Sequence, residues 1–299
     1  MKQTISTNKK LKKYSWHEME IILPYIPPLD WKSLLEYFNN HEIGGTEKTS
    51  SHSYERVFEM NGFKGFFLIT HHVADPALVL KLWIQDKEVA PFVVERVRWM
   101  FDLDLDHALM LSCLNSHPIF QEMIKIYPAL RVAKGWDIFE TIVLTILGQV
   151  VSVKRAKHLM KELVTIHGTP VEHPLTKEMF YLFPTQKQLA VADLTHLGTT
   201  QARKHSLKII SQNLLDGTIN LHKDDIDVFK EKLISVPGIG KWSVEYIALR
   251  GLGYADAFPE TDLALKRMID YYPEFNIDAV SPWRSYAAIY LWKKYTASS

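Results

Sequence analysis

The 299-residue chain contains a single cysteine, Cys113. One thiol cannot form an intramolecular disulfide, and it cannot supply the ligands of a cysteine-bound zinc site or an iron–sulfur cluster. The chain also lacks an excess of either charge, because 35 Lys and Arg residues stand against 34 Asp and Glu residues, a formal net charge of +1. Composition alone therefore indicates neither a strongly basic nor a strongly acidic partner.

Long apolar runs are absent as well. No stretch of about 18 apolar residues occurs, so we expect no segment that spans a membrane. The first residues, MKQTISTNKKLKKYSW, are polar and basic and have no apolar core of a signal peptide. We expect residues 1–15 to form a flexible tail and the protein to be cytoplasmic. Hydrophobic residues make up 47% of the chain, enough for the cores of two or three compact units.

The first hundred residues predict an antiparallel sheet with a flanking helix. Asp30 precedes the helical pattern of residues 31–38 and is a typical N-cap. Residues 53–60 and 63–70 are rich in β-forming side chains, and Asn61-Gly62 between them is the strongest short-range signal of a hairpin. Residues 77–84 add a third predicted strand.

From Val89 onward the hydrophobic period becomes helical, and we expect it to remain so to the end of the chain. The predicted helices cover residues 91–101, 119–126, 136–147, 153–167, 185–192, 201–216, 225–235, 241–250, 263–271 and 282–295. The predicted fold class is therefore α+β, with an N-terminal antiparallel sheet domain followed by a mostly α-helical core.

The segment LISVPGIGKWSV joins two of these helices. Pro237 is predicted to end the first helix, and Gly238 and Gly240 allow a sharp, partly left-handed reversal. The free N–H groups at the start of the next helix, beside Lys241, suit an anion such as phosphate. A plain corner between two helices would also use glycines. The full pattern favours a helix-hairpin-helix over residues 225–250, which holds one DNA phosphate without reading sequence.

Asp262 lies in DAFPETDLALK, at the start of the helical pattern that follows the hairpin. This position predicts an N-cap, where local N–H groups would stabilise the ionised carboxylate. A capping role alone would account for the residue. However, a carboxylate one helix away from a phosphate-binding turn is also where the deoxyribose of a bound strand would be presented.

Three blocks, FETIVLTILGQVVSVKRA, VPGIGKWSVEYIALRG and SPWRSYAAIYLWKKY, together resemble the helix-hairpin-helix superfamily of base-excision DNA glycosylases. Within it, the chain is similar to the DNA-3-methyladenine glycosylase II family over nearly its whole length. We expect three units: residues 1–106, residues 137–256, and residues 107–136 combined with 257–299. The resemblance places the active-site cleft between the two helical units.

The resemblance also assigns roles to residues. It implies that Asp262 is the catalytic carboxylate, which stabilises a sugar with oxocarbenium character and helps to orient water. Stacking on aromatic rings would recognise a cationic alkylated base. The implied base-pocket residues are Trp242, Tyr246, Trp283, Tyr37 and Phe38. The implied DNA-binding residues are Gln149, Val150, Pro237, Gly238, Ile239, Gly240 and Lys241.

The implied partner is double-stranded DNA with alkylated bases, bound by a monomer in the nucleoid. The resemblance implies no cofactor, apart from a structural Na⁺ or K⁺ ion that the family holds at carbonyls corresponding to those of Ile234, Val236 and Ile239. Two residues depart from the family. Val150 replaces the usual leucine wedge of the loop that fills the gap left by a flipped base. Leu263 stands where close relatives have an aromatic residue.

Trp242 occupies the position at which glycosylase/lyases place a Schiff-base lysine. Lys241 lies one residue earlier and, on a helix, points about 100° away. We therefore expect a monofunctional glycosylase that excises 3-methyladenine, 7-methylguanine and related bases. Two alternatives remain open: a non-catalytic helix-hairpin-helix DNA-binding protein, and a bifunctional oxidised-base glycosylase/AP lyase.

Overall fold

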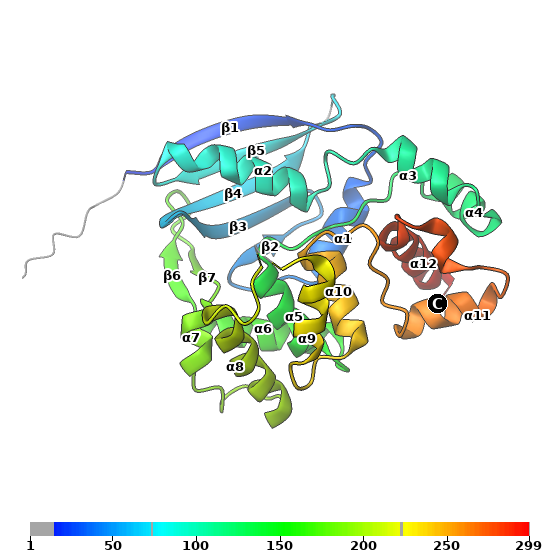
Figure 1. Ribbon diagram of the computed structural model, residues 1–299. Coiled ribbons are helices and arrows are strands. Elements are labelled where there is room, and N and C mark those ends of the chain that lie inside the picture. Colours follow the sequence, from blue (N-terminus) through cyan, green and yellow to red (C-terminus); the bar gives the residue numbers. More distant parts are fainter. Residues whose placement is uncertain (1–14, 73, 222–223, 299) are drawn as a thin grey trace, which may run out of the picture.

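A computed structural model describes residues 15–72, 74–221 and 224–298. The flexible tail predicted for the N-terminus falls almost entirely outside these ranges. An N-terminal sheet and a larger helical part make up the described chain (Figure 1), which confirms the predicted α+β class. Within these ranges, no helix is both long and apolar enough to cross a bilayer.

The main sheet is antiparallel and has the strand order β1-β5-β4-β3-β2. Its strands are β1 (His17–Pro24), β2 (Glu47–Thr49), β3 (Ser53–Met60), β4 (Phe63–His71) and β5 (Ala77–Ile84). Asn61 and Gly62 join β3 to β4 and both have positive φ, 53° and 80°, as a type I′ hairpin turn requires. The predicted hairpin and third strand are confirmed, whereas β1 and β2 were not foreseen individually.

Two helices pack on this sheet. Helix α1 (Trp31–Asn40) starts where Asp30 predicts, because the Asp30 carboxylate accepts the Ser33 N–H at 2.9 Å. Helix α2 (Ala90–Met100) buries Val93, Val97 and Met100 in the same core. The C-terminal end of α1 then points toward the helical part of the molecule and supplies one wall of the site described below.

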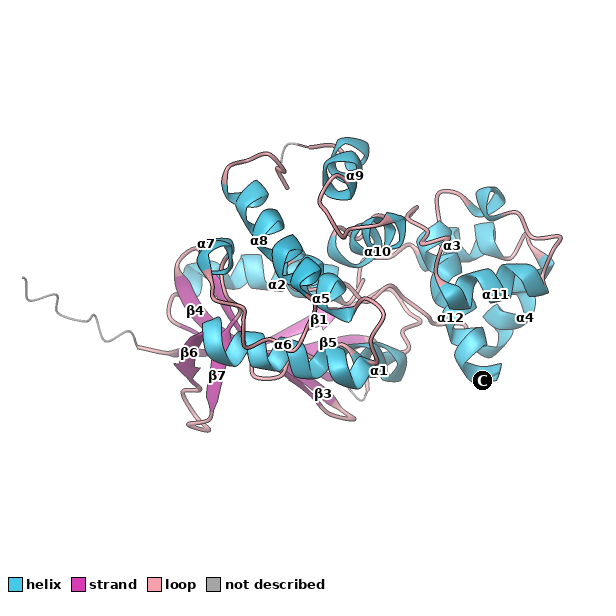
Figure 2. Cartoon of the chain, turned by 90° about the horizontal axis from the view of Figure 1, so that it is seen from below, coloured by secondary structure: helices cyan, strands magenta, loops and turns pink. Residues whose placement is uncertain are grey.

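The rest of the chain begins in one group of helices, continues into a second group and returns to the first. Their bounds are α3 (His107–Leu114), α4 (Pro118–Ile126), α5 (Ile138–Gly148), α6 (Val153–His167), β6 (Thr169–Glu172), β7 (Met179–Leu182), α7 (Gln186–Val191), α8 (Gln201–Leu215), α9 (Ile226–Ile234), α10 (Lys241–Gly251), α11 (Leu263–Tyr271) and α12 (Arg284–Ser298), with 3-10 turns at Lys87–Val89 and Ile277–Val280. Helices α3, α4, α11 and α12 gather on one side, apart from α5 to α9, in both ribbon views (Figure 2). Helix α3 was missed because HALMLSCL is apolar on most sides and lacks a helical stripe.

The prediction that the chain stays helical after Val89 is wrong at β6 and β7, which form a two-stranded sheet. Val171 and Phe180 of this hairpin pack against Phe66 of the main sheet. The Tyr181 N–H also donates to the Gly45 carbonyl at 2.8 Å. Both strands lie between the helices predicted for residues 153–167 and 185–192, and these contacts with residues far away in sequence stabilise them.

Helix α10 contacts several cores at once. Val244 and Ile247 join the cluster formed with α5, α6, α8 and α9, whereas Ala248 and Leu249 join the cluster formed with α3, α4, α11 and α12. Arg250, at its C-terminal end, donates to the Ala133 carbonyl at 2.8 Å, beside the core of the sheet domain. Helix α10 is therefore held by contacts with three parts of the molecule.

A buried ion network joins the sheet to the helical part. Arg56 of β3 donates to Glu47 of β2 and to both carboxylate oxygens of Glu140 on α5, and it is only 2% exposed. The Tyr54 hydroxyl also donates to Glu47. The two carboxylates are compensated only while the guanidinium lies between them.

Replacing Arg56 by Leu should therefore destabilise the protein strongly. The variant leaves two buried carboxylates without their cation, a loss that costs about 3–5 kcal/mol of unfolding free energy. Urea unfolding of the wild type and Arg56→Leu would measure it. As a control, Lys32→Ala removes a cation of an exposed pair and should leave the midpoint unchanged. A loss below about 1 kcal/mol in Arg56→Leu would contradict this role.

Candidate active site

The turn between α9 and α10 has one left-handed residue. Gly238 has φ +85°, and a Cβ there would lie 2.6 Å from the Ser206 hydroxyl oxygen, which itself donates to the Pro237 carbonyl. Gly240 is extended, at φ −102°, so the predicted left-handed reversal rests on Gly238 alone. Pro237 does not end α9 either, because the helix already ends at Ile234.

Gly240 is the N-cap of α10, and no side chain of the described residues caps this end of the helix. A Cβ on Gly240 would meet no atom within 4 Å, so the space in front of the helix N-terminus is open. Unpaired N–H groups with partial positive charge at an open helix start suit a phosphate oxygen. The Na⁺ or K⁺ site implied at the carbonyls of Ile234, Val236 and Ile239 stays a prediction. In this turn, the Val236 carbonyl accepts the Ile239 N–H at 3.0 Å.

The loop after α5 lies beside this turn. The Gln149 side-chain amide donates to the Gly238 carbonyl at 2.9 Å and to the Ser243 hydroxyl at 3.0 Å, so it fixes the loop to the turn. Arg203 of α8 donates to the Gln149 carbonyl. Val150 follows with φ 51° and its side chain is 100% exposed. An apolar side chain is thus held out into solvent next to the helix N-terminus.

The Asp262 carboxylate lies at the start of α11 and accepts four hydrogen bonds. Its Oδ1 accepts the Ala264 and Leu265 N–H groups at 3.0 and 3.1 Å, and the Trp292 indole N–H at 3.0 Å. Within the described part of the chain, its Oδ2 accepts one hydrogen bond, from the Trp242 indole N–H, also at 3.0 Å. The predicted cap is confirmed, and Oδ2 keeps the larger spare capacity to accept a further hydrogen bond.

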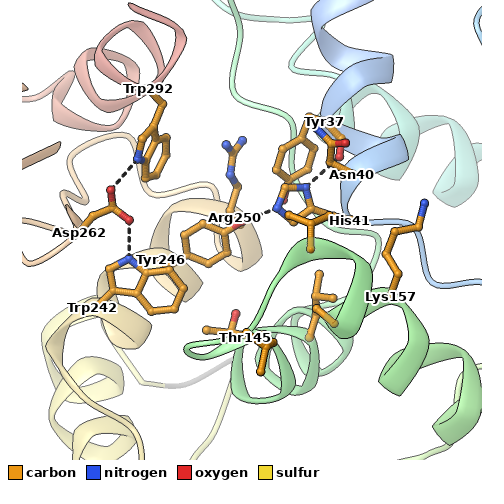
Figure 3. Close-up of a pocket in the computed structure, with 15 residues that line it drawn as sticks. Tyr37, Asn40, His41, Thr145, Lys157, Trp242, Tyr246, Arg250, Asp262 and Trp292 are labelled. Carbon is orange, nitrogen blue, oxygen red and sulfur yellow. Dashed lines mark hydrogen bonds between the residues drawn. The ribbon is translucent and has the colours of Figure 1, made fainter. Parts of the chain in front are cut away.

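Asp262 faces a cavity of about 360 Å³ (Figure 3). One wall is aromatic, since the rings of Trp242 and Tyr246 stack with centroids 5.0 Å apart and interplanar angle 18°. Tyr246 and Trp292 meet edge to face at 6.2 Å. The lining residues are Tyr37, Asn40, His41, Leu144, Thr145, Gly148, Val151, Val153, Ala156, Lys157, Trp242, Tyr246, Arg250, Asp262 and Trp292.

Residues at the C-terminal end of α1, with the C-cap His41, line the other end of the cavity. His41 stacks on the Tyr37 ring with centroids 4.2 Å apart, and its Nδ1 pairs with the Tyr37 carbonyl at 2.8 Å. The Arg250 guanidinium lies over the same Tyr37 ring, 4.0 Å from its centroid. Burial, with the positive charges of Arg250 and Lys157, lowers the pKa of His41 to about 4, so the imidazole is neutral at pH 7.

Several predicted pocket residues meet in the cavity, and two do not. Trp242, Tyr246 and Tyr37 line it together with Asp262. Phe38 is 4% exposed and packs in the core of the sheet domain, because it lies on the inner face of α1.

Trp283 also requires a correction. It precedes α12 and packs edge to face on Tyr286, in the core of the C-terminal helices. Trp292, nine residues later, supplies the pocket ring from α12. Both tryptophans lie in the block that carried the resemblance, and the sequence offers no local signal that separates them. His41, Arg250 and Lys157 were missed too, because their pocket positions depend on contacts between distant segments.

Comparisons with known proteins agree with this architecture. The AlkA N-terminal domain matches residues 20–137. DNA-3-methyladenine glycosylase 2 of Escherichia coli is 27% identical over 278 residues, 90% of this chain and 95% of that protein. A Mycobacterium tuberculosis protein described as a bifunctional transcriptional activator/DNA repair enzyme AlkA is 28% identical over 279 residues. The chain covers only 56% of its length.

Among solved structures, 3-methyladenine DNA-glycosylase from Archaeoglobus fulgidus superposes with a TM-score of 0.78 over 94% of this chain and 99% of that one, at 18% identity. At 18% identity, this similarity shows a shared fold and nothing more. The chain has the fold of the helix-hairpin-helix glycosylases and resembles DNA-3-methyladenine glycosylase II. The predicted resemblance is thereby confirmed.

The neutral His41 predicts a pH dependence of stability. Its pKa is about 4 in the folded protein against 6.5 unfolded, so the unfolded state binds more protons as the pH falls below 6.5. Between pH 7 and pH 5, this single group should lower the unfolding free energy by about 2 kcal/mol. Urea unfolding at both pH values, in the wild type and in His41→Gln, measures the contribution of His41 to this loss of unfolding free energy. Equal losses in both proteins would contradict the assignment.

Proposed function

We propose that the protein is a monofunctional DNA glycosylase that flips alkylated purines out of duplex DNA and hydrolyses their N-glycosidic bond. The observation that carries this proposal is the Asp262 carboxylate, held by two indole N–H groups at the edge of an aromatic cavity beside an open helix N-terminus. The names of the bacterial relatives and the AlkA N-terminal domain support the same activity.

The chemistry follows from what Asp262 can accept. When the bond to the base breaks, positive charge develops on the sugar, and a fixed carboxylate stabilises it without reorganising. Oδ1 is already occupied by three donors, so Oδ2 is the oxygen that would face C1′ and orient the attacking water. The two indoles keep the carboxylate from turning away.

An alkylated purine suits this site because it leaves easily. N3- or N7-alkylation gives the base a positive charge, so departure needs little help from an acid. The Trp242, Tyr246 and Trp292 rings line one side of a cavity that can hold one base, and an aromatic face attracts a cation by about 0.5–2 kcal/mol.

Docking to DNA would use the open start of α10 and the loop beside it. A backbone phosphate at the N–H groups beyond Gly240 would position the strand without reading its sequence. Val150, exposed next to this point, would fill the stack vacated by the flipped nucleotide.

Lyase chemistry is disfavoured by the placement of the amines. The indole at position 242 has no nucleophilic nitrogen, and its N–H is committed to Asp262. Lys241 lines a different cavity, with Glu245 and Asp256. Lys157 does line the Asp262 cavity, but its ammonium group donates to the Asn39 carbonyl at 2.7 Å.

The main test is release of free bases from methylated duplex DNA, identified by chromatography. The wild type should release 3-methyladenine and 7-methylguanine. Asp262→Asn should lower the rate at least about 100-fold, because the amide cannot stabilise the sugar cation, yet should bind the duplex with similar affinity. A wild type that binds DNA and releases no base would favour the non-catalytic alternative. Near-normal turnover by Asp262→Asn would remove this residue from the mechanism.

The product should be an intact abasic strand, cut only after alkali or heat. Borohydride reduces a Schiff base between an enzyme amine and the sugar to a stable protein–DNA adduct, and we expect none during turnover. An adduct that formed with the wild type but not with Lys157→Ala or Lys241→Ala would identify the amine and establish the bifunctional alternative.

A further inference from the structure

The end of the cavity opposite Asp262 contains a series of polar groups with a fixed hydrogen-bond direction. Figure 3 shows Asp262 between its two tryptophans on one side and His41 on the other, with Tyr246 between them. The Tyr246 hydroxyl lies 3.3 Å from His41 Nε2. On the other side of the imidazole, His41 Nδ1 pairs with the main-chain carbonyl of Tyr37 at 2.8 Å.

That carbonyl determines which way each proton points. A carbonyl oxygen only accepts, so His41 Nδ1 carries the hydrogen. In the neutral imidazole, Nε2 is then a bare acceptor, and the Tyr246 hydroxyl must donate to it. The Tyr246 hydroxyl therefore has no proton left for a ligand and can offer only a lone pair.

Thr145 on α5 is arranged in the same way. It is 3% exposed, and its hydroxyl donates to the Thr141 carbonyl at 2.7 Å, one turn earlier in the helix. Its oxygen can therefore only accept from a ligand in the cavity. Other donors also line the cavity: Asn40 is exposed, Lys157 donates to the Asn39 carbonyl, and Arg250, which lies over the Tyr37 ring, donates to the Ala133 carbonyl.

We propose that His41 determines base specificity by holding the Tyr246 hydroxyl as a hydrogen-bond acceptor, so that the pocket favours 6-aminopurine lesions over 6-oxopurine lesions. An exocyclic amino group donates to these acceptors, whereas a carbonyl group at the same place would bring acceptor against acceptor. The inference rests on the proposed function for its biological setting. His41 is a positioning residue in this account, since it acts through Tyr246.

The discriminating pair of probes is free 3-methyladenine and free 3-methylhypoxanthine. Both are neutral, share the methyl group and have nearly the same shape, but one carries a 6-amino group and the other a 6-oxo group. Isothermal titration calorimetry with the full chain gives the ratio of their dissociation constants. We expect the wild type to bind the amino base at least tenfold more tightly.

Variants at the two linked residues test the cause of this preference. His41→Phe keeps a ring to stack on Tyr37 but frees the Tyr246 proton, so the preference should fall to about twofold or less. Tyr246→Phe keeps the stack on Trp242 and should have the same effect. His41→Gln offers an amide oxygen as a substitute acceptor and should restore most of the preference. His52→Phe, at an exposed histidine outside the cavity, is the matched control.

The inference is overturned by a wild type that binds neither base or does not distinguish them. A preference that persists in both His41→Phe and Tyr246→Phe would also overturn it. The binding assay does not depend on catalysis. A protein that shows the His41-dependent preference but releases no base from methylated DNA would therefore contradict the proposed function and leave the pocket inference standing.

Discussion

The interaction on which the site depends is the pairing of one carboxylate with two indoles. Asp262 caps α11, and its two oxygens accept the N–H groups of Trp242 on α10 and Trp292 on α12. Three helices are thereby fixed relative to one another at a single point. The same contacts orient the aromatic rings that line the cavity, so the position of the carboxylate and the shape of the pocket are determined together.

Helix α10 extends this coupling to the rest of the molecule. Its start forms the open N-terminus at Gly240, its middle carries the ring pair of Trp242 and Tyr246, and its end carries Arg250 against the sheet domain. A phosphate bound at the start would lie one or two turns from the carboxylate and the pocket. The helix therefore fixes the separation between the site where a strand phosphate would bind and the cavity where its base would bind.

Sequence reasoning succeeded where local chemistry decides the structure. The Asp262 cap and the Asn61-Gly62 turn depend on a few adjacent residues, and both were predicted correctly. It failed where distant segments decide. The hairpin of β6 and β7 forms only against the main sheet, and His41 and Trp292 reach the cavity only through the packing of α1 and α12. The resemblance assigned the pocket ring of the C-terminal block to Trp283, whereas Trp292 lines the cavity.

The most direct test of this account is a crystal structure of the protein with duplex DNA that contains a pyrrolidine abasic-site analogue. Its protonated ring nitrogen mimics the charge of the sugar cation, and transition-state mimics bind where catalysis occurs. The account predicts this nitrogen within hydrogen-bond distance of Asp262 Oδ2, with a backbone phosphate at the start of α10. A pyrrolidine bound elsewhere, for example in the cavity that Lys241 lines, would contradict it.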